Sequence, residues 1–366
     1  MNNLISIVNE FITEGQVKAI EPFGSGHIND SYLITTIPGS VPDYVLQKIN
    51  HHVFRNVPQL MDNIMKVSNH IQCGLQSKSN MVTDFQIFQL IRSKTGHCFF
   101  QDPDGNYWRL LDHIRNSKSY DIVESPELAF EAGKAFGIFQ LLTSDLHAGS
   151  LFEILPNFHN IEFRLENFRK AMTQNPANRV KETQPEIRFV ETRANEMYTI
   201  LRLGNQGLIP LRVTHNDTKF NNVLFNPENK AISVVDLDTV MPGYILYDFG
   251  DAIRTGASTA AEDEADLSRV HIDLKLFEAY SRGYLETARN FLNPDEIAHL
   301  AFSAKFMTYL IGLRFLTDHI DGDHYFKTGF PGHNLQRARA QFRLLESMEH
   351  HFKEMQEIID FIAYFA

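Results

Sequence analysis

The sequence predicts an α+β protein of two lobes, a β-rich lobe over residues 1–113 and a mainly helical lobe over residues 114–366. Its 366 residues exceed what one compact core usually organises. Short apolar runs bounded by Gly and Pro fill the first hundred or so residues, and long helical patterns begin near residue 125. Two regions with different periodicities favour two lobes joined by a short linker.

The N-terminal region is expected to form a sheet. Four apolar or alternating runs, separated by turn residues, are typical of strands: KAIEPFGSGHINDSYLITT, YVLQKIN, IQCGLQSK and CFFQDPDGNYWRLLDHI. Helices are expected over about 57–71 and 84–93. The opening stretch MNNLISIVNEFITEG predicts an amphipathic surface helix, and it lacks the basic face of a membrane anchor.

The C-terminal region is dominated by helical periodicity. The predicted helices are PELAFEAGKAFGIFQLLTSD, RFVETRANEMYTILRLG, DLSRVHIDLKLFEAYSRGYLETARNFL, PDEIAHLAFSAKFMTYLIGLRFLTDHI and one final helix over about 334–365. One β-like stretch, LRVTHNDTKFNNVLFNPENKAISVVDLDTV, interrupts them. A β-rich lobe followed by a helical lobe with one buried hairpin is typical of bilobal, protein-kinase-like folds.

Composition excludes several classes of function. The net charge of −11 disfavours a nucleic-acid partner, which normally requires a clustered basic face. No apolar stretch approaches 18 residues and no signal peptide is recognisable, so we expect a cytoplasmic protein without a membrane partner. The two cysteines, Cys73 and Cys98, have neither metal-ligand spacing nor the density of a disulfide framework.

The stretch THNDTKFNNVLF carries the strongest chemical pattern. His215, Asp217 and Asn222 form the spacing H-x-D-x-x-x-x-N, the catalytic-loop pattern of kinases. Phosphoryl transfer from ATP needs a carboxylate to receive the acceptor hydroxyl and oxygen ligands for the metal. Asp217 fits the first role. Asn222, with Asp236 at the end of the next apolar run, fits a Mg²⁺ site. Each motif alone is common in turns, but together they indicate a kinase.

Nucleotide contacts are predicted in the N-terminal lobe. Gly24 and Gly26 lie between two β-like runs, where glycine lets backbone amides approach phosphate oxygens. A plain hairpin turn is the alternative for this segment. WRLLDHI is expected to be the last strand of the lobe, with backbone groups of Asp112, His113 and Ile114 facing the adenine edge.

At these residues the chain resembles the aminoglycoside phosphotransferase/choline kinase superfamily, and within it the N-acetylhexosamine 1-kinases. The matching motifs occur in order from residue 20 to beyond 326: IEPFGSGHIN, YVLQ, LRVTHNDTKFNNVL, DLDTVMPG, YDFGD, GAST and GLRFLTDHIDGDHYF. The resemblance implies a protein-kinase-like fold and transfer from ATP, with Mg²⁺, to the anomeric hydroxyl of N-acetylglucosamine or N-acetylgalactosamine.

The resemblance also implies roles for individual residues. Asp217 resembles the family's catalytic base, Asn222 and Asp236 its metal-binding pair, and Asp248 a structural carboxylate that supports the loop with His215. Sugar-contacting positions fall on His27, Arg314 and Tyr325, and Ile20 would lie near the acetamido group. Thr255 stands where the family has a bulky aromatic residue, which predicts a roomier pocket. For Arg314, a salt bridge to Asp318 four residues on is the alternative.

One position departs from the wider kinase pattern, in which a strand Lys binds phosphates and pairs with a helix Glu. In YVLQKIN either Gln47 or Lys48 could take the place of that Lys, and a slip by one residue reverses the face. We favour Gln47 as a nucleotide-binding residue, paired with Asn63 of the following helix, and a solvated Gln47 is the alternative.

Two other functions are compatible with parts of the sequence. One is a kinase of the same superfamily with another acceptor, such as an aminoglycoside, choline, homoserine or fructosamine. Cationic acceptors require carboxylates or an aromatic cage, whereas Arg314 and His27 suit a neutral sugar. The other is a nucleotide-binding regulator without catalysis, for which loss of Asp217, Asn222 or Asp236 would be the sign. All three are present.

Overall fold

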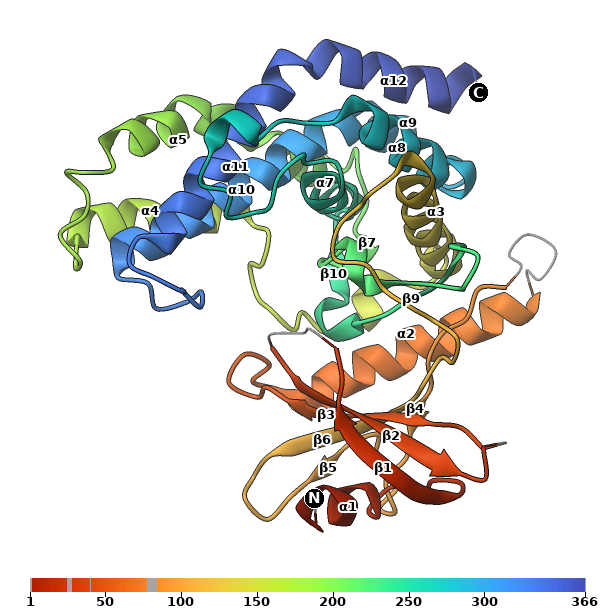
Figure 1. Ribbon diagram of the computed structural model, residues 1–366. Coiled ribbons are helices and arrows are strands. Elements are labelled where there is room, and N and C mark those ends of the chain that lie inside the picture. Colours follow the sequence, from red (N-terminus) through yellow and green to blue (C-terminus); the bar gives the residue numbers. More distant parts are fainter. Residues whose placement is uncertain (1, 25–27, 40, 78–83, 366) are drawn as a thin grey trace.

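The structure is a computed structural model that describes residues 2–24, 28–39, 41–77 and 84–365. A β-sheet lobe lies at one end of the molecule and a helical lobe at the other (Figure 1). The α+β, bilobal fold expected from the sequence is thus confirmed. The lobe boundary proposed at residues 113 and 114 falls directly after the last strand of the sheet, which ends at Asp112.

Every strand pair of the N-terminal sheet is antiparallel. Its strands are β1 (Gln16–Pro22), β2 (Asp30–Ile37), β3 (Tyr44–Ile49), β4 (Leu90–Ile91), β5 (Phe100–Gln101) and β6 (Tyr107–Asp112). The order is β1-β2-β3-β6-β4, and β5 also pairs with β6. Helix α1 (Asn2–Val8) covers one face, and α2 (Val57–Ser77) lies between the other face and the helical lobe (Figure 1).

The sheet register decides which side chains face the second lobe. Gln47 pairs with Arg109 across β3 and β6, and Lys48 pairs with Trp108. The Lys48 ammonium lies 5.9 Å from the centre of the Trp108 ring, and Trp108 belongs to the small core under α1. Because neighbouring residues on a strand point to opposite faces, Gln47 faces the helical lobe and Lys48 does not. The Gln47 register favoured from the sequence is the one that the structure has.

Two local expectations for this lobe are wrong. The run IQCGLQSK was expected to be a strand, but its residues through Ser77 continue α2. Its apolar residues recur at helical spacing with those of 57–71, so the helix continues through them. A helix was expected over 84–93, but this segment is extended and supplies β4. Sheet pairing with β6 determines its structure, and local helical periodicity does not.

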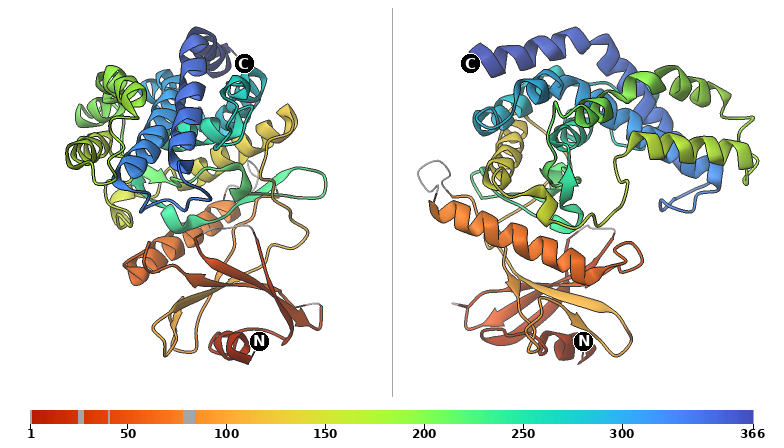
Figure 2. Two further views of the ribbon diagram at one scale, coloured as in Figure 1. Left: turned by 60° about the vertical axis from the view of Figure 1, so that its left-hand side comes forward. Right: turned by 180° about the vertical axis from the view of Figure 1, so that it is seen from behind.

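The helical lobe is built around α10 (Leu300–Asp321), which is buried along most of its length. The other helices are α3 (Pro126–Thr143), α4 (Ile161–Gln174), α5 (Gln184–Met197), α6 (Thr199–Asn205), α7 (Ile245–Gly256), α8 (Leu274–Ala288), α9 (Pro294–Ala298), α11 (His333–His350) and α12 (Phe352–Phe365). The expected final helix is interrupted at His351. Figure 2 shows α4 and α5 on one side of the lobe and α3 and α8 on the other.

Helices α3 and α8 approach each other unusually closely. A Cβ atom on Gly133 would overlap the carbonyl oxygen of Tyr280, and one on Gly283 would overlap that of Phe130. Glycine at the two crossing points therefore permits this packing. No helix in the described part of the chain is both long and apolar enough to cross a bilayer.

Four short strands form two hairpin-like pairs beneath these helices. They are β7 (Arg212–Thr214), β8 (Val223–Phe225), β9 (Ala231–Val234) and β10 (Met241–Gly243). β8 pairs with β9 and β7 with β10, both antiparallel. The inward side chains of Val223, Phe225 and Val234 are fully buried. The turn between β8 and β9 bonds to Glu131 of α3, whereas Asp238, beyond the other end of the hairpin, contacts Arg109 of the sheet lobe.

Candidate active site

The loop of residues 215–222 joins β7 to β8 and is supported by Asp248 of α7. The Asp248 carboxylate accepts hydrogen bonds from the backbone N–H groups of His215 at 2.8 Å and Asn216 at 2.7 Å. Gln140 donates a third from its side-chain amide at 2.6 Å. Burial raises the pKa of Asp248, but three donors around its oxygens favour the carboxylate. Asp248 therefore anchors the backbone directly before Asp217.

His215 is buried beneath the same loop in one defined tautomer. Its Nε2 lies 3.0 Å from the carbonyl oxygen of Val235, which can only accept, so Nε2 carries the hydrogen. The backbone N–H of Asp217 donates to Nδ1 at 3.3 Å. Burial lowers the pKa of His215, in agreement with a neutral ring. The imidazole thus links the loop to the end of β9 and orients Asp217.

The Asp217 carboxylate reaches solvent, since its side chain is 25% exposed. The Lys219 ammonium lies 3.1 Å from Oδ1, and the Asn222 amide donates to Oδ2 at 3.3 Å. The negative charge of Asp217 is the main cause that raises the pKa of Lys219. A carboxylate on a braced loop, accessible to solvent, can receive a proton from a bound hydroxyl.

Asn222 and Asp236 are neighbours across the β8–β9 hairpin. The backbone N–H of Val235 donates to the Asn222 carbonyl at 2.9 Å. The Asn222 amide nitrogen donates to the Asp217 carbonyl at 2.9 Å, which leaves the amide oxygen for a cation. Asp236 has a left-handed φ of 61° and an exposed side chain. Desolvation by the surrounding protein, followed by the negative charges of Asp238 and Asp217, raises its pKa.

This donor set fits a hard divalent cation such as Mg²⁺. An amide oxygen and a carboxylate are ligands that Mg²⁺ prefers, and it usually completes its shell with water and substrate phosphates. A bound divalent cation would also offset the negative charge of the carboxylates around Asp236. No group of three His, Cys, Asp or Glu side chains converges on a metal position in the described residues. The protein alone therefore supplies a partial site, as expected for a metal carried by a nucleotide.

The two lobes are joined by a set of polar residues that we call the interlobe network: Asn29, Gln47, Arg109 and Asp238. Arg109 of β6 forms an ion pair with Asp238, and both side chains are 4% exposed. Arg109 also donates from Nε to the Gln47 amide oxygen at 2.8 Å. Asn29 donates to the second Asp238 oxygen at 2.6 Å. A guanidinium group from β6 thus lies beside the position that a strand Lys takes in other kinases.

The expected pairing of Gln47 with Asn63 is wrong. Gln47 donates to Ser31 at 2.9 Å and accepts from Arg109. Asn63 is fully buried, donates to the carbonyl oxygens of Phe152 and Val240, and accepts from the Phe152 N–H group. Its hydrogen bonds hold α2 against the helical lobe, so they are not available to β3.

Arg109 and Asp238 were missed in the sequence. A weak signal for each was available. Arg109 is the one charged residue within YWRLLD before its last position, in a strand that otherwise buries apolar groups, and Asp238 follows Asp236 by two residues. Neither signal identifies the partner, because 129 residues separate the two side chains.

The predicted nucleotide contacts of the sheet lobe come from the segments that follow β1 and β6. Gly24 has a left-handed φ of 79° and no atom within 4 Å of a Cβ position. The ring of Phe23, next to Gly24, lies 5.5 Å from that of His113. The His113 N–H donates to the Asp43 carbonyl, and the Ile114 carbonyl accepts from Ser117 at 2.6 Å. Burial raises the pKa of Asp112. Gly26 and His27 lie outside the described residues, and all these nucleotide contacts stay predictions.

Arg314 lies in α10 and is 8% exposed. It donates to the Tyr325 hydroxyl at 3.2 Å, and its guanidinium lies 5.0 Å from the centre of the Phe158 ring. The alternative salt bridge to Asp318 is not formed. Asp318 instead accepts from the backbone N–H groups of residues 324, 325 and 326 and from Asn334. It therefore fixes the loop that carries Tyr325.

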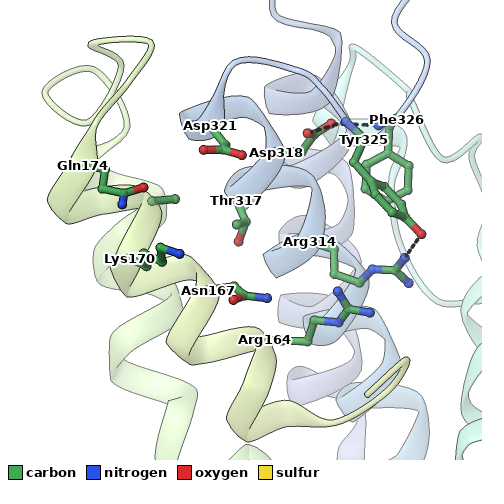
Figure 3. A pocket seen from close by; sticks show the side chains of 11 residues that line it. Arg164, Asn167, Lys170, Gln174, Arg314, Thr317, Asp318, Asp321, Tyr325 and Phe326 are labelled. Atoms are coloured by element: carbon green, nitrogen blue, oxygen red, sulfur yellow. Dashed lines mark hydrogen bonds between the residues drawn. The ribbon is translucent and has the colours of Figure 1, made fainter. Parts of the chain in front are cut away.

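Arg314 and Tyr325 line a pocket between α4 and α10 with a volume of about 310 Å³ (Figure 3). Its wall is made by Arg164, Asn167, Lys170, Ala171, Gln174, Arg314, Thr317, Asp318, Asp321, Tyr325 and Phe326. His159 connects this region to the catalytic loop. Its ring lies 4.4 Å from that of Phe158, and its Nε2 lies 3.4 Å from the Asn216 carbonyl oxygen.

The structure does not bring Ile20 to this pocket. Ile20 pairs with Ile34 across β1 and β2, and both pack into the small core under α1. Directly opposed residues in antiparallel strands share a face, so Ile20 points away from the face that carries Gln47 and Arg109. Thr255 lies in α7 and donates to the Asp251 carbonyl at 3.0 Å.

A braced acidic loop, the neighbouring oxygen donors of Asn222 and Asp236, and a bilobal fold are typical of a small-molecule kinase. The profile of the phosphotransferase enzyme family matches residues 19–289, which is more than half of the chain, and the chain therefore belongs to this family. It is a phosphotransferase of the aminoglycoside phosphotransferase superfamily that uses an alcohol acceptor.

Similar solved structures have the same fold at low sequence identity. An aminoglycoside phosphotransferase from Alicyclobacillus acidocaldarius is 10% identical with a TM-score of 0.59, over 97% of this chain and 96% of that chain. Amicoumacin kinase, in complex with AMP-PNP, Ca²⁺ and Ami, is 13% identical with a TM-score of 0.60, over 93% of this chain and 92% of that chain. A microcompartment-associated aminopropanol kinase is 11% identical with a TM-score of 0.57, over 97% and 98%.

Proposed function

We propose that this protein phosphorylates the anomeric hydroxyl of an N-acetylhexosamine, using ATP and Mg²⁺, and releases the sugar 1-phosphate. The observation that carries the proposal is the position of Asp217. Its partly exposed carboxylate lies on a loop that Asp248 braces, and His159 connects the same loop to the pocket of Arg314 and Tyr325. An acceptor in that pocket could present a hydroxyl to Asp217.

In the proposed reaction the acceptor oxygen attacks the terminal phosphorus, and the bond from that phosphorus to the bridging oxygen of ADP breaks. Asp217 orients the hydroxyl and takes its proton. Asn222 and Asp236 would hold the metal, which neutralises phosphate charge when it is bound. Lys219, 3.1 Å from Asp217, lies where a cation would attract a phosphate group.

The acceptor side favours a hydroxyl-rich molecule. Arg314 offers five donors in a rigid fork, and the Tyr325 hydroxyl can donate or accept. A cationic acceptor such as choline is disfavoured, because the wall has two arginines and Lys170 against two carboxylates, and one of these, Asp318, already accepts from backbone N–H groups. A regulator without catalysis is disfavoured because Asp217, Asn222 and Asp236 are all present and lie together.

A substrate panel tests the proposal. Release of ADP would be measured with hexoses and hexosamines, and Asp217→Asn serves as the control for background hydrolysis. We expect turnover of N-acetylhexosamines, none with the methyl glycoside in which the anomeric oxygen is blocked, and retained turnover with a 6-deoxy sugar. Phosphorylation of the methyl glycoside but not of the 6-deoxy sugar would identify a hexose 6-kinase and overturn the acceptor assignment.

A further inference from the structure

Two arginines of the pocket face each other without an acidic partner. Arg164 comes from α4 and Arg314 from α10, and Figure 3 shows their guanidinium groups side by side at one end of the pocket. Among the described residues, no carboxylate lies within 4.0 Å of either group. Buried or half-buried cations are normally paired, so two adjacent unpaired guanidinium groups require an explanation.

The protein satisfies only part of their hydrogen-bonding capacity. Arg164 donates from Nε and Nη2 to the Phe158 carbonyl at 3.2 and 2.8 Å. Arg314 donates to the Tyr325 hydroxyl, its one hydrogen-bond partner in the described part of the chain. Three aromatic rings lie near the Arg314 guanidinium at 5.0–5.5 Å, but ring faces stabilise the cation and do not accept its in-plane donors well. Several N–H donors therefore remain directed toward the cavity.

The charges of this end of the pocket have one sign. Desolvation and the neighbouring Arg314 lower the pKa of Arg164 to about 9, which still leaves it charged at neutral pH. Lys170 is a further cation of the wall, farther along α4 and next to Gln174 (Figure 3). Of the two carboxylates in the wall, Asp318 is occupied by backbone N–H groups, and Asp321 lies with Gln174 at the opposite end (Figure 3). The Asp251 carboxylate also acts on Arg314, but it is paired with Arg254 at 2.9 Å, so the arginine end keeps an excess of positive charge.

We propose that Arg164 and Arg314 form a subsite that binds an anionic group, a phosphate or a carboxylate. Two guanidinium groups can each offer parallel N–H donors to such a group, which has oxygens at matching spacing. The anion can come from two sources: a negatively charged substituent on the acceptor, or a free anion that binds beside a neutral acceptor. The subsite goes beyond the proposed function, because anion binding needs neither ATP nor turnover.

Equilibrium binding of inorganic phosphate tests the subsite directly. Calorimetric titration would be carried out at constant ionic strength, with AMP-PNP and Mg²⁺ filling the nucleotide site. We expect Arg164→Gln to weaken phosphate binding by at least about tenfold, or about 1.4 kcal/mol, and Arg164→Lys to restore part of it. Arg169→Gln is the matched control, since Arg169 lies on the same helix and pairs with the exposed Glu191.

The two sources are separated by turnover. If the anion belongs to the acceptor, a hexuronate reacts with a higher kcat/KM than the matching hexose, and Arg164→Gln removes this preference, whereas Arg169→Gln keeps it. If the anion is free, inorganic phosphate shifts the KM for a neutral acceptor, and Arg164→Gln abolishes that shift.

The proposal is overturned if wild-type protein binds no phosphate above the salt control, or if Arg164→Gln and Arg169→Gln behave alike. Thermal unfolding measured without phosphate identifies a variant that fails to fold. If Arg164→Gln fails to fold, the phosphate affinity of Arg164→Lys is compared with that of the wild type instead. Loss of hexosamine kinase activity alone would leave the phosphate titration unaffected, so failure of the two proposals can be distinguished.

Discussion

The interlobe network and the pocket between α4 and α10 both contain buried or half-buried arginines, but they differ in how the positive charge is compensated. Arg109 is paired with Asp238 and bonded to Gln47. Arg164 and Arg314 lie together with aromatic rings, one hydroxyl and one carbonyl as neighbours. Removing one partner of a buried ion pair leaves an uncompensated charge, so the first arrangement serves the fold. The second is more compatible with a ligand.

The different compensation of these arginines gives a criterion that applies to other proteins. A buried cation with a complete set of protein partners is already accounted for by the structure, whereas one with spare donors facing a cavity marks a candidate binding site. The following substitutions test whether the two regions differ in this way, beginning with the loop that lies between them.

The largest effect is expected at Asp217. Asp217→Asn keeps the shape of the side chain but cannot take a proton, so turnover should fall by about 10²–10⁴, the usual range for loss of a general base. Thermal unfolding and ATP affinity should change little, because Asp248 and His215 still hold the loop. A steady-state assay measures the rate. Wild-type turnover in this variant would remove Asp217 from the mechanism.

Breaking the interlobe network should cost stability. Arg109→Met leaves Asp238 buried without its cation, and we expect a loss of about 3–5 kcal/mol in the free energy of unfolding. Denaturant unfolding followed by circular dichroism measures it. Arg169→Met, which breaks an exposed pair with Glu191, should cost less than about 1 kcal/mol. Equal losses in the two variants would contradict the structural role of Arg109.

The metal position should respond selectively. Asp236→Ala removes a carboxylate ligand, so the affinity for Mg²⁺-ATP should fall by at least about tenfold, equivalent to about 1.4 kcal/mol. Binding of metal-free ATP should change much less. Titrations with and without Mg²⁺ separate the two. If both affinities fall equally, Asp236 acts on the nucleotide directly or only shapes the turn.

The acceptor pocket should respond without a change at the nucleotide site. Arg314→Ala should raise the KM for the sugar by at least about tenfold. Without the guanidinium group, the sugar hydroxyls that it binds have no hydrogen-bond donor. The KM for ATP should stay nearly constant. A parallel rise in both values would mean that the substitution distorts α10 rather than the pocket.

The smallest effect is expected at Lys48. Lys48→Gln removes a cation that lies over Trp108, on the sheet face that points away from the helical lobe. The ATP affinity should therefore remain unchanged. Stability should fall by about 0.5–1 kcal/mol, the contribution of an exposed cation–π contact. Nucleotide titration and unfolding provide the measurements. A marked loss of ATP affinity would contradict the register that places Gln47 toward the helical lobe.

The sequence by itself determined the features that depend on neighbours along the chain. Asp217 and Asn222 lie in one loop, and the β8–β9 hairpin that follows is short enough to return Asp236 to Asn222. Long apolar periodicities likewise identified most helices of the second lobe, because packing one face of a helix requires that spacing. The family resemblance, carried by these motifs, was sufficient to indicate the two-lobed fold.

Only the tertiary structure decided which distant side chains meet. Arg109 and Asp238 are 129 residues apart, and Arg164 and Arg314 come from different helices, so no local pattern connects them. Tertiary packing also decided that Ile20 lies under α1. Alternation along a strand defines two faces, but which face meets the second lobe depends on how α1 and α2 pack against the sheet.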